Sequence, residues 1–255
     1  MNILITSGGT IEKIDAVRSI SNMSTGKLGS LIADCFAGES NVGRIFYICS
    51  SSAIKPQCAK AEINCADSVS SLESLVRELL CSVKFDIIVH CMAVSDYRVA
   101  SVTSAAALAG LLASNADKIK QLEGSAAVSA VTELLKKSSV DAKGKIDSDE
   151  ENLFMLMERT PKIISLFHRL SPNSTLIGFK LLDNAPLEIL IDKAYKILTQ
   201  NKCSFVLAND LRDITDELHT GYLIDKNKNY TKYSSKAEIA SAIVASALKE
   251  RMDSL

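Results

Sequence analysis

The chain has 255 residues, of which 47% are hydrophobic and 23% are charged. This composition can fill a sizeable core and excludes a mainly disordered protein. Lys and Arg number 29, Asp and Glu number 30, and the net charge is −1, so nothing predicts a general affinity for nucleic acid or for an anionic membrane. The seven Cys include no C-x-x-C pair, and residues 1–5 carry no basic start of a signal peptide. We therefore expect reduced thiols and a cytoplasmic location.

Strands and helices are predicted to alternate along residues 2–91. Short apolar runs without period-two alternation predict strands, and apolar residues that recur at helical spacing predict helices. In chain order, the predicted elements are a strand at 2–6, a helix at 24–36, a strand at 42–49, a helix at 68–81 and a strand at 85–91. Ser24 or Thr25 is the expected N-cap of the first helix.

The remainder of the chain continues this alternation of strands and helices after an inserted segment. Residues 102–137 are rich in Ala, Leu and Ser and are expected to be mostly helical, inside an insertion or lid region at about 99–150 of one domain, 1–255. The later elements are expected as a helix at 161–170, a strand at 174–180, a helix at 186–200, a strand at 203–208, a hairpin at 222–233 and a helix at 235–251. The predicted fold class is α/β, a doubly wound, mostly parallel Rossmann-like sheet with helices on both faces.

Polar clusters follow the predicted strands at the ends that a parallel sheet brings to one edge. After the first strand, Gly8 and Gly9 allow the backbone to approach an anion, and a following helix N-terminus adds its dipole. The pattern is not G-x-G-x-x-G, and Gly26-Lys27 does not end a P-loop, because Leu28 replaces the required Ser or Thr. The other clusters lie at 15–29, 93–98, 178–180 and 207–210.

Each cluster also has an ordinary structural interpretation. The glycine turn can be a tight connection without a ligand, and the loop at 15–27 can be an N-cap beside a surface Arg. Asp96 can hold a metal or a ribose hydroxyl, or it can bind the amides of its own turn. Cys91 and Cys203 are expected to be buried structural thiols, and the His at 90, 168 and 219 to be structural or surface residues. The convergence of the clusters on one crevice is what favours a binding site.

Seven segments together resemble phosphopantothenate–cysteine ligase of coenzyme A synthesis, in its stand-alone bacterial form. They are TSGGT (6–10), IDAVRSISN (14–22), STGK (24–27), MAVSDY (92–97), TPKII (160–164), IGFKL (177–181) and AND (208–210). The resemblance runs from residue 2 to about residue 250, and the order and spacing of the segments make it specific. It implies that the carboxylate of 4′-phosphopantothenate attacks the α-phosphate of CTP, which releases pyrophosphate. L-cysteine then attacks the acyl-cytidylate to give phosphopantothenoylcysteine and CMP.

The resemblance also implies site residues. The catalytic residues that it implies are Asn22, Lys145 and Arg18. The nucleotide-binding residues that it implies are Gly8, Gly9, Thr10, Ser24, Gly26, Ala93, Asp96, Lys143, Phe179, Lys180, Ala208 and Asn209. In this family the asparagine contacts the acyl-nucleotidylate, a role that suits an amide because it binds oxyanion charge without titrating. A lid lysine closes on the phosphates, with Lys145 as the first candidate and Lys143 as the second.

The resemblance further implies partners. We expect Mg²⁺ as the cofactor with Asp96 as its ligand, and a homodimer whose substrate site includes residues of the partner subunit. Between Arg98 and Lys143 this chain is longer than the members fused to a decarboxylase, which pass quickly from the Asp-Tyr-Arg motif to the lid.

The sequence leaves three alternatives to a CTP-dependent ligase. ATP can replace CTP in the same ligation. A nicotinamide-dependent reductase on a similar sheet requires a G-x-G-x-x-G turn and an acidic residue at the end of the second strand, whereas that strand ends at Cys49-Ser50-Ser51. A nucleotide-binding regulatory protein would bind CTP and release no pyrophosphate.

Overall fold

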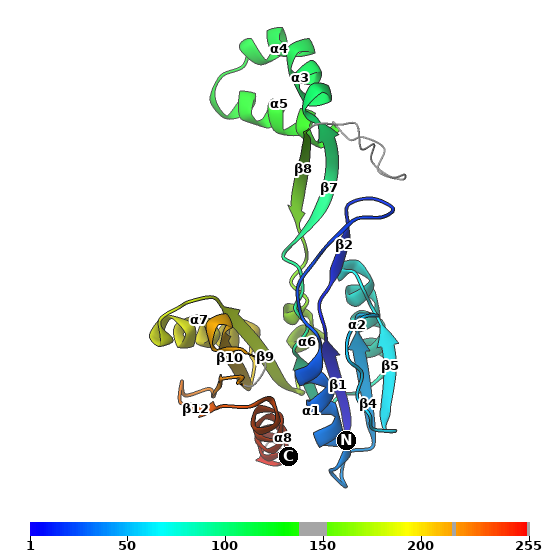
Figure 1. Ribbon diagram of the computed structural model, residues 1–255, viewed down its shortest axis with the longest axis vertical. Helices are drawn as coiled ribbons and strands as arrows, with labels where there is room; N and C mark the ends of the chain where they lie inside the picture. Colours follow the sequence, from blue (N-terminus) through cyan, green and yellow to red (C-terminus); the bar gives the residue numbers. More distant parts are fainter. Residues whose placement is uncertain (138–151, 216–217, 254–255) are drawn as a thin grey trace. The chain divides into compact units, whose positions relative to one another are not determined.

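The computed structural model describes residues 1–137, 152–215 and 218–253, which form two compact units (Figure 1). The first unit comprises Met1–Thr10, Asn22–Val94 and Lys162–Leu255, and the second comprises Ile11–Ser21 and Ser95–Pro161. Of the insertion expected at about 99–150, the structure describes residues 99–137, which fall in the second unit. That the whole chain works as one ligase domain stays a prediction. None of the described helices is both long and apolar enough to cross a bilayer.

Among the described residues, a sheet of eight strands forms the centre of the first unit. From edge to edge its order is β5 (Ala61–Cys65), β4 (Arg44–Cys49), β1 (Asn2–Ser7), β6 (Ile87–His90), β9 (Thr175–Leu182), β10 (Phe205–Asp210), β11 (Gly221–Ile224) and β12 (Tyr230–Tyr233). The pairs from β5 to β10 are parallel, and the pairs made by β11 and β12 are antiparallel. The order of the parallel strands reverses between β1 and β6, which is where such sheets bind ligands.

Helices cover both faces of this sheet (Figure 1). One face carries α1 (Lys27–Ala37) and α8 (Lys236–Asp253), and the other carries α2 (Val69–Ser82), α6 (Ile164–Leu170) and α7 (Leu187–Asn201). In β1, Ile3 and Ile5 pack on the α1 side, Leu4 packs on the α2 side, and all three are fully buried. Burial on both faces produces a continuous apolar run in the sequence. The predicted doubly wound, mostly parallel sheet is confirmed.

The first two helices of this unit begin in different ways. α2 begins with a capping box, in which the Ser68 side chain accepts a hydrogen bond from the Ser71 N–H and the Ser71 side chain accepts one from the Ser68 N–H. α1 begins after Gly26, which has a φ of 73° and supplies no side-chain cap. The N-cap predicted at Ser24 or Thr25 is therefore wrong, because a left-handed glycine turn leads the chain into the helix, although Thr25 Oγ1 does accept from the Lys27 N–H at 3.4 Å.

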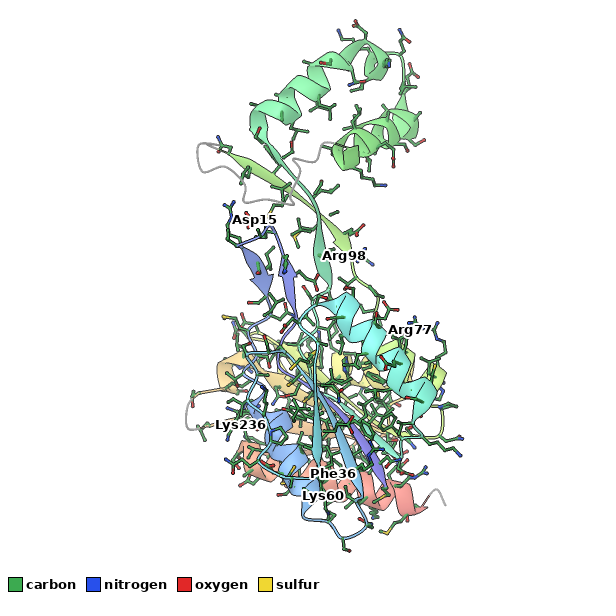
Figure 2. All side chains as sticks on the ribbon, turned by 90° about the vertical axis from the view of Figure 1, so that its right-hand side faces the viewer. Asp15, Phe36, Lys60, Arg77, Arg98 and Lys236 are labelled. Atoms are coloured by element: carbon green, nitrogen blue, oxygen red, sulfur yellow. The ribbon has the colours of Figure 1, made fainter. Side chains whose placement is uncertain are left out.

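The second unit contains antiparallel ribbons and a helical segment. Its elements are β2 (Ile11–Lys13) paired with β3 (Ser19–Ser21), β7 (Tyr97–Ser104) paired with β8 (Leu153–Arg159), α3 (Ala105–Ser114), α4 (Ala116–Lys120) and α5 (Gly124–Lys137). Arg98 of β7 pairs with Glu158 of β8 at 2.6 Å (Figure 2). The helical prediction for 102–137 is confirmed from Ala105 onward but wrong at 102–104, where β-branched Val102 and Thr103 favour the strand.

Burial makes His90 a core residue whose protonation opposes folding. Its Nδ1 lies 2.7 Å from Thr6 Oγ1, its ring packs on Phe167, and burial lowers its pKa to about 4. Between about pH 6.5 and this value, the unfolded chain binds a proton that the folded chain does not. The free energy of unfolding should therefore fall by about 3 kcal/mol as the pH falls through this window.

Urea unfolding curves recorded at about pH 7 and about pH 4.5 would measure this loss. We expect His90→Gln to lose less stability than the wild type over the same range, because its side chain does not titrate. An equal pH dependence in the two proteins would contradict the role assigned to His90.

Candidate active site

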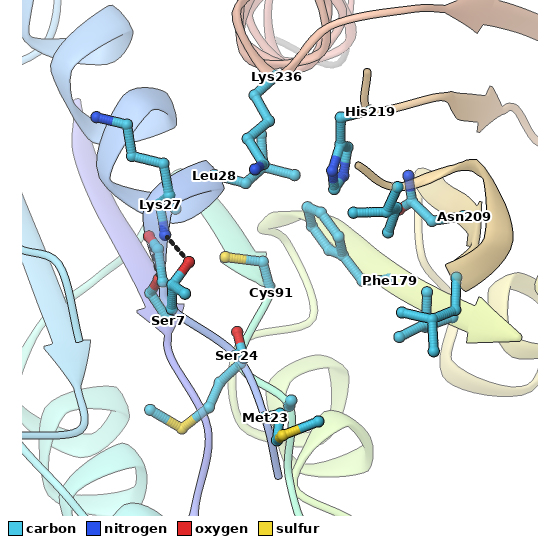
Figure 3. A pocket seen from close by; sticks show the side chains of 18 of the residues that line it. Ser7, Met23, Ser24, Lys27, Leu28, Cys91, Phe179, Asn209, His219 and Lys236 are labelled. Atoms are coloured by element: carbon cyan, nitrogen blue, oxygen red, sulfur yellow. Dashed lines mark hydrogen bonds between the residues drawn. The ribbon is translucent and has the colours of Figure 1, made fainter. Parts of the chain in front are cut away.

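The candidate active site is a pocket of about 680 Å³ within the first unit (Figure 3). Its lining comes from the carboxyl ends of parallel strands and from the N-termini of two helices. The main contributors are Ser7 of β1, residues 91–93 after β6, residues 179–181 of β9, Asn209 of β10, residues 26–29 at the start of α1, and Lys236 of α8. Residues from the clusters predicted at several strand ends therefore surround a single pocket, as expected for an open parallel sheet.

Glycines bring α1 close to the end of β1. A Cβ at Gly29 would overlap Ser7 Oγ and lie 2.8 Å from Cys91 Sγ, and a Cβ at Gly26 would lie 3.1 Å from Ser7 Oγ. Gly8, with a φ of 85°, makes the turn that follows the strand. A dinucleotide fingerprint places the glycines of the turn and of the helix in one short motif. Here residues 11–21, which belong to the second unit, separate them in the chain.

Backbone contacts fix the loop that follows β1. The Thr10 N–H donates to the Ala93 carbonyl at 3.0 Å, and Gly9 forms an isolated parallel bridge with Ala93. The Asn22 N–H donates to the Thr10 carbonyl at 3.1 Å, and a Cβ at Gly9 would overlap the Asn22 carbonyl oxygen. This loop supports the pocket wall, and its contacts use the backbone of Asn22 rather than its side-chain amide.

The N-terminus of α1 has the character of an anion site. Its N-cap residue Gly26 supplies no side-chain cap, Thr25 Oγ1 accepts from the Lys27 N–H at 3.4 Å, and residues 26–29 line the pocket. The N–H groups of such a turn and the helix dipole attract negative charge. Lys27 and Lys180 add positive charge to the lining, and none of its described residues is a carboxylate.

The wall formed by β9 and β10 offers an aromatic ring and an oriented amide. Phe179 and Asn209 line the pocket, and Asn209 Nδ2 donates to the Thr220 carbonyl at 2.7 Å. Ala208 is fully buried and packs with the core on the α2 side of the sheet. Because neighbouring residues of a strand face opposite sides, the Ala208 side chain is outside the pocket lining.

The other predicted site residues lie outside this unit or outside the described residues. Arg18 and Asp96 belong to the second unit, whereas Lys143 and Lys145 fall in the part of the chain that the structure does not describe. Arg18 forms an ion pair of 2.6 Å with Asp15, which follows β2 (Figure 2). The catalytic roles of Arg18, Lys145 and Asn22 stay predictions.

Comparison with known proteins identifies the family. The family model described as DNA/pantothenate metabolism flavoprotein C-terminal domain matches residues 1–107 and 99–250. The chain belongs to this family. Membership confirms the resemblance that the seven sequence segments indicated.

Relatives in this family match the chain over nearly its full length. The crystal structure of the DNA/pantothenate metabolism flavoprotein from Streptococcus pneumoniae has a TM-score of 0.80 and 31% identity, and covers 98% of this chain and 99% of that one. The coenzyme A biosynthesis bifunctional protein CoaBC of Methanocaldococcus jannaschii is 27% identical over 249 residues, or 97% of this chain. This chain spans 50% of that relative's length.

A more distant structure shares the fold alone. It is a Cab2 mutant in complex with phosphopantothenate-cysteine, with a TM-score of 0.69 and 13% identity, covering 99% of this chain and 87% of that one.

Two thiols of this chain, those of Cys91 and Cys203, are poor nucleophiles near neutral pH. Cys91 Sγ donates to the Thr6 carbonyl at 3.0 Å, and burial raises the pKa of Cys91 to about 12. Burial raises the pKa of Cys203 to about 12 as well. Both thiols are protonated near neutral pH, and thiols react chiefly as thiolates. Cys203 is buried, as predicted. Cys91 is half-buried and lines the pocket, so its structural role stays a prediction.

Two ionisable residues of the pocket lining were missed by the sequence analysis. His219, expected to be structural or on the surface, lines the pocket, and so does Lys236. Burial, and then the charge of Lys236, lower the pKa of His219 to about 4. His219 belongs to no motif that would have indicated a binding site. Lys236 could have been noticed, because a positive charge at the first position of a helix opposes the helix dipole.

The described residues contain no preformed magnesium site. They contain no group of three or more His, Cys, Asp or Glu side chains that could hold a metal. Mg²⁺ usually takes one or two carboxylates together with substrate phosphates and water, and no described residue of the pocket lining is a carboxylate. Asp96 as a metal ligand stays a prediction.

Proposed function

We propose that this chain is a phosphopantothenate–cysteine ligase of coenzyme A biosynthesis. The observation that carries the proposal is the pocket itself, in which residues of the recognised segments surround the N-terminus of α1. The name of the CoaBC relative, and the phosphopantothenate-cysteine bound to a protein of the same fold, support this assignment.

In the proposed first step, a carboxylate oxygen of 4′-phosphopantothenate attacks the α-phosphorus of CTP. The bond from that phosphorus to the β-phosphate oxygen breaks, pyrophosphate leaves, and an acyl-cytidylate remains. Both reactants are anions, so their approach requires oriented positive charge. The first turn of α1, together with Lys27 and Lys180, can supply it in a lining without described carboxylates.

In the proposed second step, the amine of L-cysteine attacks the acyl carbon and gives up a proton. The bond between that carbon and the phosphate oxygen breaks, so that an amide forms and CMP leaves. Asn22 is proposed to donate a side-chain N–H to the oxygen that gains negative charge. Support comes from its recognised motif and from its backbone, which Thr10 holds beside the loop after β1.

Nucleotide choice and assembly are parts of the same proposal. We propose CTP as the nucleotide, with ATP as the alternative, and a homodimer as the working form. Mg²⁺ is proposed to accompany the triphosphate. The resemblance to the stand-alone bacterial ligase supports all three.

Pyrophosphate release separates this proposal from its alternatives. We expect the purified chain to release pyrophosphate from CTP only with 4′-phosphopantothenate, and to form CMP and phosphopantothenoylcysteine once cysteine is added. Release of pyrophosphate from ATP but not from CTP would identify ATP as the nucleotide substrate. A regulatory protein would bind CTP without releasing pyrophosphate, and a reductase would oxidise NADH or NADPH. Failure to release pyrophosphate from either nucleotide would reject the ligase.

A further inference from the structure

Lys236 occupies an unusual place for a lysine. It is the first residue of α8, where a positive charge opposes the helix dipole. It is half-buried, and its side chain reaches into the pocket beside Leu28 of α1 (Figure 3). No described residue forms an ion pair or hydrogen bond with its ammonium group. A partly buried charge is costly without a partner, so this placement points to an anion supplied by a ligand.

The surroundings of Lys236 strengthen this interpretation. The N-terminal turn of α1 lines the same pocket, and of its first three N–H groups only that of Lys27 donates to a described side chain, Thr25 Oγ1. The neighbouring imidazole of His219 is neutral near pH 7, because its pKa is lowered to about 4, and therefore does not repel the ammonium group. The pocket end near Lys236 thus combines a cation with exposed helix amides.

The position of Lys236 also indicates which phosphates it would meet. Figure 3 shows Lys236 on the opposite side of the pocket from Met23 and Ser24. These two residues directly follow Asn22, where the proposed function places the reacting acyl group and hence the α-phosphate. Lys236 also lies beside Leu28 in the first turn of α1, whose N–H groups attract phosphate. We therefore assign it to the phosphates beyond the α-phosphate. Phe179, on the β9 wall, offers the apolar face that suits a base.

We propose that Lys236 binds the β- and γ-phosphates of the nucleoside triphosphate and then the departing pyrophosphate. This inference rests on the proposed function, because it assigns a residue to the nucleotide of that same pocket. A lysine suits the role as a flexible point charge. It offsets the negative charge that accumulates on pyrophosphate as the bond to the α-phosphorus breaks.

Nucleotides of different phosphate length test the proposal directly. Calorimetric titration of the full chain with CTP, CDP and CMP, without 4′-phosphopantothenate, measures binding in the absence of turnover. For Lys236→Met we expect CTP affinity to fall about tenfold to a hundredfold, since a charge-assisted hydrogen bond is lost. CMP affinity should stay within about twofold, and CDP should fall between the two. Lys236→Arg should restore most of the CTP affinity.

A matched control lies on the same helix. Lys249→Met removes the same charge from an exposed position of α8 outside the pocket lining, and we expect wild-type affinity for all three nucleotides. Melting temperatures confirm that each variant is folded, and Lys236→Gln serves if Lys236→Met does not fold.

The outcomes distinguish this inference from the proposed function. If CTP, CDP and CMP all weaken equally, or if CTP does not weaken, the assignment of Lys236 to the terminal phosphates is overturned while the ligase proposal stands. If the wild type binds CTP but releases no pyrophosphate with 4′-phosphopantothenate, the ligase proposal fails while the Lys236 assignment is still decided by the titration. A wild type that binds neither the cytidine nor the adenosine nucleotides overturns both.

Discussion

Gly29→Ala should fold with a lower melting temperature and lose about a hundredfold in nucleotide turnover. Alanine normally stabilises a helix relative to glycine by about 1 kcal/mol. At this position the added Cβ would overlap Ser7 Oγ and lie 2.7 Å from Ser7 Cβ and 2.8 Å from Cys91 Sγ. Ser7 is fully buried and its hydroxyl donates to the Gly26 carbonyl at 3.1 Å. Neither the added Cβ at Gly29 nor the Ser7 side chain can relieve this overlap unless the start of α1 moves away from β1.

That movement would act on the site and on the fold together. Overpacking of this kind costs about 1–3 kcal/mol of stability, which exceeds the gain in helix propensity. Displacing the α1 amides by about 1 Å can reduce the rate by about a hundredfold, because the reaction depends on oriented groups. Thermal unfolding and pyrophosphate release from CTP would measure the two effects.

Gly110→Ala provides the matched control. Gly110 lies inside α3, and a Cβ there would meet no atom within 4 Å. We expect this variant to gain up to about 1 kcal/mol in stability and to keep wild-type activity. If Gly29→Ala behaved like Gly110→Ala, the close approach of α1 to β1 would not be needed for either stability or activity.

The parallel core could be predicted because its strands are buried on both faces. Ile3, Leu4 and Ile5 face alternate sides, yet all are apolar because helices cover each side. β5 (Ala61–Cys65) was missed because it is an edge strand with Glu62 and Asn64 among its five residues. β7 and β8 were missed for a related reason. They pair only with each other, so burial imposes no clear apolar period on them.

The pocket could be predicted only where its residues follow parallel strands. Ser7, Phe179 and Asn209 are of this kind, and the sheet brings them to one edge. Lys236 arrives with α8, after an antiparallel hairpin, so no strand-end rule points to it. Nothing in the sequence indicated that Gly29 lies close to Ser7, because residues 11–21, which separate them in the chain, belong to the second unit.

Asn22→Asp is expected to leave the fold intact and to block amide formation. The fold uses the Asn22 backbone, whose N–H donates to Thr10 and whose carbonyl packs against Gly9. Aspartate has nearly the same size, but it replaces an amide donor with a negative charge. In the proposed mechanism that charge would stand beside a phosphate and a developing oxyanion. Loss of one such donor costs about 2.7–4 kcal/mol, or about a hundredfold to a thousandfold in rate.

The two chemical steps should respond unequally to this variant. The charge disfavours the tetrahedral oxyanion formed when cysteine attacks, so acyl-cytidylate should accumulate after pyrophosphate has left. Single-turnover measurements of pyrophosphate and of phosphopantothenoylcysteine would resolve the two steps. Asn41→Asp makes the same chemical change at an exposed position, where the carbonyl of Asn41 binds the Met1 amine, and should behave as wild type. Near-normal turnover in Asn22→Asp would remove Asn22 from catalysis, whereas an equal loss in both steps would assign it to nucleotide binding instead.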